Sequence, residues 1–118
     1  MNKIFYIKSC NTCLRIINDL KLPEGFIFRD IKEDALTVSE LNELTELAGS
    51  YQALFSRRAK LYKEMGLKDL DLSEADYKYY ILDHYTFLKR PVIVIDKNIF
   101  IGNSKAVTEK AYKAIHAV

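Results

Sequence analysis

The feature that most constrains the fold is a short apolar run followed at once by two closely spaced cysteines. Residues 4–7 (Ile-Phe-Tyr-Ile) predict a buried strand, and Cys10 and Cys13 stand just beyond it. The apolar residues that then recur at helical spacing are Leu14, Ile17 and Leu20. A cysteine at such a strand-to-helix turn lies at the positive end of the helix dipole, where a thiolate is favoured over a thiol. We therefore expect Cys10 to be a redox-active or nucleophilic cysteine.

Size and composition favour one globular domain. The 118 residues are enough to bury a core without disulfide staples, and 49% of them are hydrophobic. The net charge is only +2, from 18 basic and 16 acidic residues, so charge implies neither direct nucleic-acid binding nor a membrane partner. The first residues hold too short an apolar run for a secretion signal, and no segment approaches the roughly 18 apolar residues of a membrane-spanning helix. We expect a cytoplasmic protein.

The sequence leaves several uses of the cysteine pair open. In a reducing cytosol a structural disulfide is not expected, and so short a loop would give little stabilisation. A zinc site needs four ligands, but there is no second cysteine pair, and the histidines, His84 and His116, lie far apart. Two incidental core cysteines are the remaining alternative, because free cysteine is often buried. We take thiol chemistry as the working interpretation and expect no metal and no bound cofactor.

The rest of the chain alternates strand and helix patterns around an all-helical middle region. Residues 26–31 predict a second strand, parallel to the first through a right-handed βαβ connection. Helical patterns then fill about residues 37–86, beginning with a capping box formed by Thr37 and Glu40. The residues expected to point inward from the stretch between 51 and 66 are Leu54, Leu61 and Met65.

Two more strands and a helix complete the pattern. Residues 91–95 and 99–101 are apolar runs separated by three polar residues, which predicts a β-hairpin, and Ser104 is the expected N-cap of the last helix. The order βαβ, helical insert, ββα predicts an α/β thioredoxin-like fold, with a mixed four-stranded sheet flanked by helices. We expect residues 1–118 to form a single domain, because insert helices with one apolar face each need the rest of the core.

Four segments resemble the arsenate reductase (ArsC)/Spx-like family of the thioredoxin superfamily. They are Ser-Cys-Asn-Thr-Cys (9–13), Phe-Arg-Asp-Ile (28–31), Ser-Arg-Arg-Ala-Lys-Leu-Tyr-Lys-Glu-Met-Gly-Leu (56–67) and Phe-Leu-Lys-Arg-Pro-Val-Ile-Val (87–94). The similarity covers nearly the whole chain, and its specific part is the last block combined with the cysteine pair. It implies a cis peptide bond before Pro91, next to the Cys10 sulfur, with Arg90 facing that sulfur. Without the resemblance, Pro91 would be interpreted as an ordinary proline at the start of a strand.

Thiol exchange is the activity expected first. Cys10 would attack a disulfide or oxidised substrate, and Cys13, one helical turn on, would resolve the mixed disulfide. Candidate cations near the sulfur are Arg15, Arg58 and Arg90. The electron donor implied is glutathione, glutaredoxin or thioredoxin.

Two alternatives follow from the same resemblance. Arsenate-reducing members hold the oxyanion with several arginines, of which the insert arginine corresponds to Arg58 or Arg57. The arginine expected four residues after the cysteine is replaced by Leu14, with Arg15 one step further, and the one after the last strand is missing near Gly102. Spx-like members imply a different class, a regulator that binds RNA polymerase and uses the cysteine pair as a redox switch.

Overall fold

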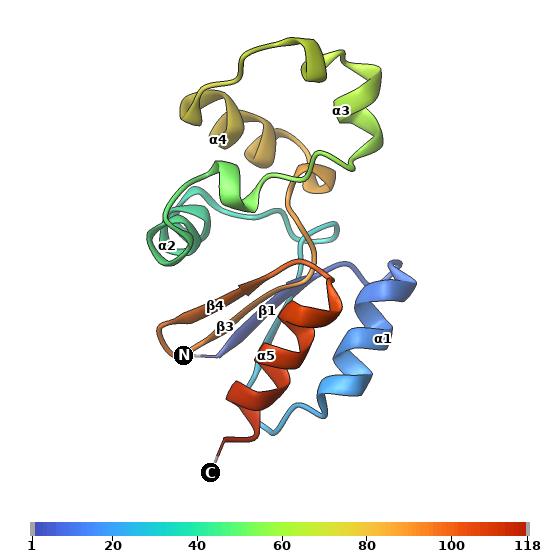
Figure 1. Ribbon diagram of the computed structural model, residues 1–118, viewed down its shortest axis with the longest axis vertical. Helices are drawn as coiled ribbons and strands as arrows, with labels where there is room; N and C mark the ends of the chain where they lie inside the picture. Colours follow the sequence, from blue (N-terminus) through green and yellow to red (C-terminus); the bar gives the residue numbers. More distant parts are fainter. Residues whose placement is uncertain (1, 118) are drawn as a thin grey trace. The chain divides into compact units, whose positions relative to one another are not determined.

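The computed structural model describes residues 2–117 (Figure 1). The chain divides into two compact units, each described by itself below. The first contains the described residues up to Asp34 and those from Arg90 onward, and the second is Ala35–Lys89. Within residues 2–117, no helix combines the length and apolar character needed to cross a bilayer.

The first unit is built on a mixed four-stranded sheet. Its strands are β1 (Lys3–Tyr6), β2 (Ile27–Asp30), β3 (Val92–Ile95) and β4 (Asn98–Ile101), in the order β2-β1-β3-β4. β1 runs parallel to β2 and antiparallel to β3, and β3 and β4 form an antiparallel hairpin. The helices of this unit are α1 (Asn11–Leu20) and α5 (Lys105–Ile115), which pack against each other. The predicted α/β arrangement of strands and helices is confirmed.

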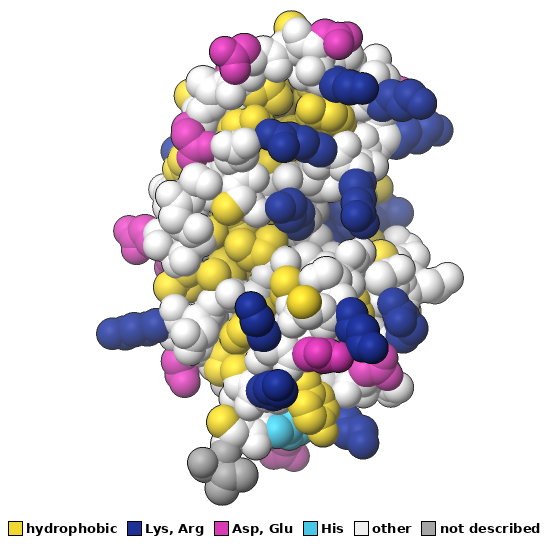
Figure 2. Space-filling view, in the orientation of Figure 1, with side chains coloured by type: hydrophobic (Ala, Val, Ile, Leu, Met, Phe, Trp, Pro, Cys, Tyr) yellow, Lys and Arg dark blue, Asp and Glu magenta, His cyan; other side chains and the backbone are white. Residues whose placement is uncertain are grey.

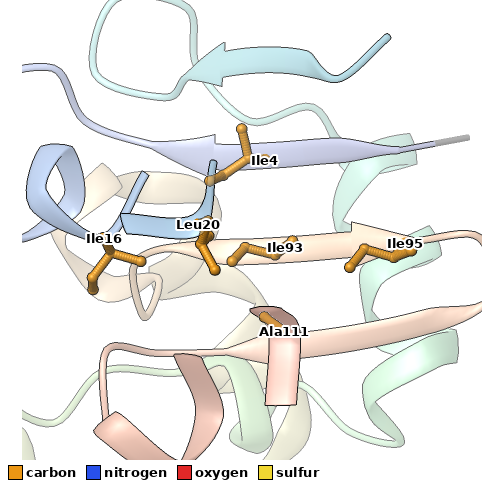
Figure 3. Packing of buried hydrophobic residues seen from close by; sticks show 6 residues of the cluster. All are labelled: Ile4, Ile16, Leu20, Ile93, Ile95 and Ala111. Atoms are coloured by element: carbon orange, nitrogen blue, oxygen red, sulfur yellow. The ribbon is translucent and has the colours of Figure 1, made fainter. Parts of the chain in front are cut away.

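The core of the first unit lies between the sheet and these two helices. Aliphatic side chains from β1, β3, α1 and α5 meet there: Ile4, Ile16, Leu20, Ile93, Ile95 and Ala111 (Figure 3). Ile4 and Ile93 are directly paired across β1 and β3, so their side chains leave the sheet on the same face. Burying each isoleucine or leucine side chain of this set stabilises the fold by about 1.5–3 kcal/mol. This packing holds the start of α1 at the carboxyl end of β1.

The buried face of α1 differs from the expected one. Leu14 was expected to point inward, but 43% of its surface is exposed. The fully buried positions are Cys13, Ile16 and Leu20, and Ile17 is partly buried beside them. Both sets fit helical spacing, and only the position of the sheet relative to the helix decides between them. The correction matters for chemistry, because it places Cys13 on the core side of the helix.

The hairpin turn is also one residue shorter than expected. Asp96 and Lys97 form the turn, while Asn98 belongs to β4 and pairs with Ile95. Asp96 has φ +54°, a left-handed conformation that a short hairpin turn requires and that aspartate tolerates. Its N–H donates to Oδ1 of Asn2 at 3.0 Å. Because the turn is this tight, the β3–β4 pairing includes Asn98, a polar residue that was expected in the turn.

The second unit is all helical, as the sequence pattern indicates. Its helices are α2 (Val38–Ala48), η1 (Gln52–Leu54), α3 (Lys60–Glu64), η2 (Leu67–Asp69), α4 (Glu74–Asp83) and η3 (Tyr85–Phe87). The predicted capping box is confirmed: the N–H of Glu40 donates to the Thr37 hydroxyl at 3.0 Å, and the Glu40 carboxylate accepts the N–H of Thr37 at 3.0 Å. Whether this unit and the first one form a single domain stays a prediction.

Aromatic rings fill the interior of the second unit. The ring of Phe55 lies 4.9 Å from that of Tyr77 and 5.4 Å from that of Phe87, measured between centroids. Leu54 is buried as expected, but Met65 is 47% exposed, so its inward prediction is wrong. The reason is that α3 ends at Glu64, and the chain leaves helical geometry before Met65 can face the interior.

Candidate active site

The candidate site is built around Cys10 at the junction of β1 and α1. The chain turns after Ile7, whose carbonyl accepts the N–H of Cys10 at 3.0 Å. Cys10 is the N-cap residue of α1, with an extended backbone, and its own carbonyl accepts the N–H of Leu14 at 3.1 Å. The first turn of α1 contains no acidic residue. The sulfur of Cys10 is therefore placed at the positive end of a helix without a competing carboxylate.

The two cysteines have opposite acidities although they are chemically identical. Burial works against ionisation of Cys10, but the backbone N–H and thiol of Cys13, the charge of Arg90 and the N–H of Thr12 hold its pKa below the ordinary value. Burial raises the pKa of Cys13 to about 11, and its hydrogen bond to Cys10 acts in the same direction. Cys10 is partly exposed and Cys13 is fully buried, and both are free thiols. The arrangement favours ionisation of Cys10 over that of Cys13, and a thiolate at Cys10 accepts a hydrogen bond from the Cys13 thiol.

Arg90 and Pro91 directly precede β3, the strand that neighbours β1. The peptide bond between them is cis, as the resemblance implied. Pro91 is buried, and its carbonyl accepts the N–H of Gly102 at 2.9 Å. Arg90 is partly buried, and its positive charge lowers the pKa of both Cys10 and Cys13. Three of the residues expected at the site, Cys10, Cys13 and Arg90, thus act on one another electrostatically.

The other two candidate arginines are both exposed. Arg15 is exposed on α1 and lines a groove of about 420 Å³ between α1 and α5, together with Asp19 and Lys105. Arg58 is exposed in the second unit, so its role beside Cys10 stays a prediction. Figure 2 shows many basic side chains on one face of the molecule, among apolar and acidic ones. Exposure of an arginine therefore does not by itself mark a site.

Asp30 has a positioning role that the sequence did not reveal. It ends β2, and its carboxylate accepts the backbone N–H of Lys8 at 3.4 Å and that of Lys32 at 3.1 Å. These bonds tie the turn before Cys10 to the turn after β2. Asp30 belongs to one of the segments that resembles the family, but nothing in its local pattern indicates a partner in another strand. Only the parallel pairing of Tyr6 with Asp30 brings the two turns together.

Metal ligands do not converge in the part of the chain that the structure describes. Within residues 2–117, no three His, Cys, Asp or Glu side chains lie close enough together to hold a metal ion. The described residues offer a partly exposed thiol of lowered pKa with a second thiol in contact. These are the two groups that thiol–disulfide exchange requires.

Comparisons with known proteins agree with the thioredoxin-like class that the sheet and the cysteine pair define. The solved arsenate reductase from Vibrio cholerae superposes with a TM-score of 0.71 at 20% identity, over 96% of each chain. A solved arsenate reductase related protein from Brucella melitensis has a TM-score of 0.65 at 20% identity, over 99% of this chain and 95% of its own. At such low identity these likenesses establish the fold.

The family itself is established by sequence. The sequence model of the ArsC family matches residues 5–111, so the chain belongs to this family. The Escherichia coli protein YfgD, named as uncharacterized, is 28% identical over 85% of this chain and 87% of its own. The global transcriptional regulator Spx 1 of Bacillus cereus is 27% identical over 86% of this chain and 79% of its own. The predicted ArsC/Spx-like resemblance is confirmed.

Proposed function

We propose that the chain is a thiol–disulfide oxidoreductase with Cys10 as nucleophile and Cys13 as resolving cysteine. The Cys10 thiolate attacks one sulfur of a substrate disulfide, and the other substrate sulfur leaves as a thiolate that takes up a proton. Cys13 then gives up its proton and attacks the Cys10 sulfur, which releases the second substrate thiol. The substrate gains two electrons and the protein is left with a Cys10–Cys13 disulfide. A thiol donor of the glutathione, glutaredoxin or thioredoxin class restores both thiols.

The observation that carries this proposal is the difference in acidity within the pair. A lowered pKa at a partly exposed Cys10 supports attack at neutral pH, and a raised pKa at buried Cys13 keeps that thiol protonated until the mixed disulfide forms. Once Cys10 is bound to a substrate sulfur it carries no negative charge, so the effect that holds the proton on Cys13 weakens. Membership of the ArsC family supports a thiol-based reaction of this kind.

Cysteine variants test the division of roles. The reduced chain is mixed with oxidised glutathione, quenched with acid and analysed by intact mass. We expect the parent to end as the internal disulfide, Cys13→Ser to accumulate a glutathione adduct on Cys10, and Cys10→Ser to react at no more than about a hundredth of the parent rate, because a buried thiol of raised pKa is a poor nucleophile. Lys113→Gln, which changes an exposed side chain in the last turn of α5, is the control and should match the parent.

Two results would replace this proposal with an alternative. If Cys13→Ser kept full turnover with glutathione and arsenate, a one-cysteine arsenate reductase would describe the chain better. The second alternative is a redox-switched transcriptional regulator, favoured by the similarity to the Spx 1 regulator. Retention of RNA polymerase subunits on the immobilised chain, dependent on whether Cys10 and Cys13 are oxidised, would support that function.

A further inference from the structure

The groove between α1 and α5 carries charged side chains that the fold does not use. It belongs to the first unit and has a volume of about 420 Å³, within the range of sites that bind small molecules. Its lining includes Ile16 and Leu20 of the core and the exposed ring of Tyr112. Four charged side chains on the same groove make no ion pair or hydrogen bond with any residue in 2–117: Arg15, Asp19, Lys105 and Glu109.

The two walls of the groove have the same order of charge. β1 and β4 each run antiparallel to β3, so α1 and α5, which follow them, begin at the same end of the sheet (Figure 1). On α1, Arg15 lies one turn nearer to that end than Asp19. On α5, Lys105 lies one turn nearer to it than Glu109. The groove therefore has a basic end, formed by Arg15 and Lys105, followed by an acidic turn, and Figure 2 shows both kinds of charge over these helices.

The basic end suits a phosphate group. Arginine and lysine bind phosphate oxygens by charge-assisted hydrogen bonds. α5 begins at Lys105, and its first turn contains no acidic residue, so the positive end of the helix dipole adds to the attraction. A free phosphate ion would gain nothing from the carboxylates one turn away, which repel it. The ligand that fits both walls carries its phosphate at one end only.

The acidic turn and the ring beyond it suit a nucleoside. Carboxylates accept hydrogen bonds from ribose hydroxyls, as they do in dinucleotide-binding sites, and an aromatic ring gives a base a surface on which to stack. At a rise of about 1.5 Å per residue along α5, Glu109 lies about 6 Å and Tyr112 about 10 Å beyond Lys105. A 5′-nucleotide has its phosphate, ribose and base in this order over a comparable length.

The far end of the groove is already ordered. Nε2 of His116 lies 2.8 Å from the carbonyl oxygen of Leu20, which joins the C-terminal ends of α5 and α1. The ring of Tyr112 lies 4.3 Å from that of His116, measured between centroids. A ring held in this way loses little conformational entropy when a base packs on it.

We propose that this groove binds a 5′-ribonucleoside monophosphate. Arg15 and Lys105 bind the phosphate. Asp19 and Glu109 accept hydrogen bonds from the ribose hydroxyls, and Tyr112 stacks on the base. The proposal goes beyond the thiol–disulfide reaction, whose two cysteines do not line the groove.

Titration of 5′-AMP into the reduced full chain, followed by NMR, tests the site. We expect amide shifts on α1 and α5 around Arg15 and Glu109. Lys105→Gln should raise Kd by roughly three- to fivefold, the size expected for an exposed ion pair. Tyr112→Ala should raise it by at least about fivefold, because stacking is lost, while Tyr112→Phe should retain the parent's affinity. Lys110→Gln, an exposed lysine of α5 outside the groove, is the control and should also match the parent.

Analogues of the nucleotide test its class. 2′-Deoxy-AMP lacks one ribose hydroxyl, and inorganic phosphate lacks the nucleoside. We expect the parent to bind 2′-deoxy-AMP about three- to tenfold more weakly than AMP, the cost of one lost hydrogen bond, and Glu109→Ala to reduce this preference. Inorganic phosphate should bind more weakly than either nucleotide.

Three results would overturn the inference. The first is equal affinity for AMP and inorganic phosphate, which would make the groove a simple anion site. The second is equal affinity of the parent for AMP and 2′-deoxy-AMP. The third is the absence of shifts on α1 and α5, whether or not AMP shifts other residues. None of these results bears on the exchange reaction of Cys10 and Cys13, which the cysteine variants test separately.

Discussion

At the scale of single residues, the site shows how neighbours rather than residue type decide acidity. Cys10 and Cys13 are the same side chain one helical turn apart, yet the pKa of the first is lowered and that of the second is raised to about 11. Cys10 gains from helix-terminal N–H groups and from Arg90, whereas Cys13 faces the core and donates to an anionic partner. The same hydrogen bond therefore favours the thiolate at one end and the thiol at the other.

Removing the charge of Arg90 should shift the reactivity of Cys10. Arg90 favours the thiolate, so Arg90→Gln should raise the pKa of Cys10 and move the profile of alkylation rate against pH to higher pH. Below that profile's midpoint the variant should react more slowly than the parent. The measurement is iodoacetamide alkylation in Cys13→Ser backgrounds, with Arg90→Lys as the charge-retaining control. An unchanged profile for Arg90→Gln would show that this charge does not act on the sulfur.

At the scale of secondary-structure elements, α1 links the core to the site. Its buried face, Cys13, Ile16 and Leu20, is anchored between the sheet and α5, while its N-terminus carries Cys10. His116 strengthens the other end, since its Nε2 lies 2.8 Å from the carbonyl oxygen of Leu20. A helix held along its length in this way keeps its first N–H groups in a constant position relative to the sulfur.

A matched pair of substitutions tests which face of α1 is buried. Ile16→Ala removes a side chain from the core cluster and should lower the free energy of unfolding by about 2–5 kcal/mol. Leu14→Ala changes an exposed side chain two residues away and should cost no more than about 0.5 kcal/mol. Urea denaturation followed by circular dichroism gives both values. Equal losses would mean that the helix is rotated from the orientation described.

At the scale of the whole molecule, the central question is whether the two compact units fold as one. The sequence prediction of a single domain rests on the need of insert helices for a shared core. The second unit has an aromatic interior of its own around Phe55, Tyr77 and Phe87, and the first has the aliphatic cluster beneath its sheet. Each unit thus contains apolar packing, and only cooperativity distinguishes one domain from two.

Two probes report separately on the units. Six of the eight tyrosines lie within residues 35–89 and the chain has no tryptophan, so intrinsic fluorescence follows mainly the second unit. Protection of the buried Cys13 thiol, measured by pulsed labelling in Cys10→Ser, follows the first. For a single cooperative domain the urea midpoints from the two probes should coincide. Clearly separated midpoints would contradict the single-domain prediction.

Most of what the sequence alone determined is local. The hydrophobic period predicts the strand before Cys10 and the helix after it. The capping box of Thr37 and Glu40 follows from side chains that reach backbone groups three residues away. Such interactions are complete within one short segment, so the segment's own residues suffice to predict them. The family resemblance added the cis bond before Pro91, which no local pattern indicated.

Only the tertiary structure decided what surrounds each cysteine of the pair. Each of these features joins residues that are distant in the chain. They are the buried face of α1, the charge of Arg90 near Cys10, and the hydrogen bond that Asp30 accepts from the turn before the site. Burial and electrostatic interaction depend on distance in space. The hydrophobic period and the spacing of residues in the sequence do not show which strand or turn lies next to a given helix. The sequence therefore predicted which sulfur is the nucleophile, while the packed fold supplied the burial and the charges that separate the acidities of the two thiols.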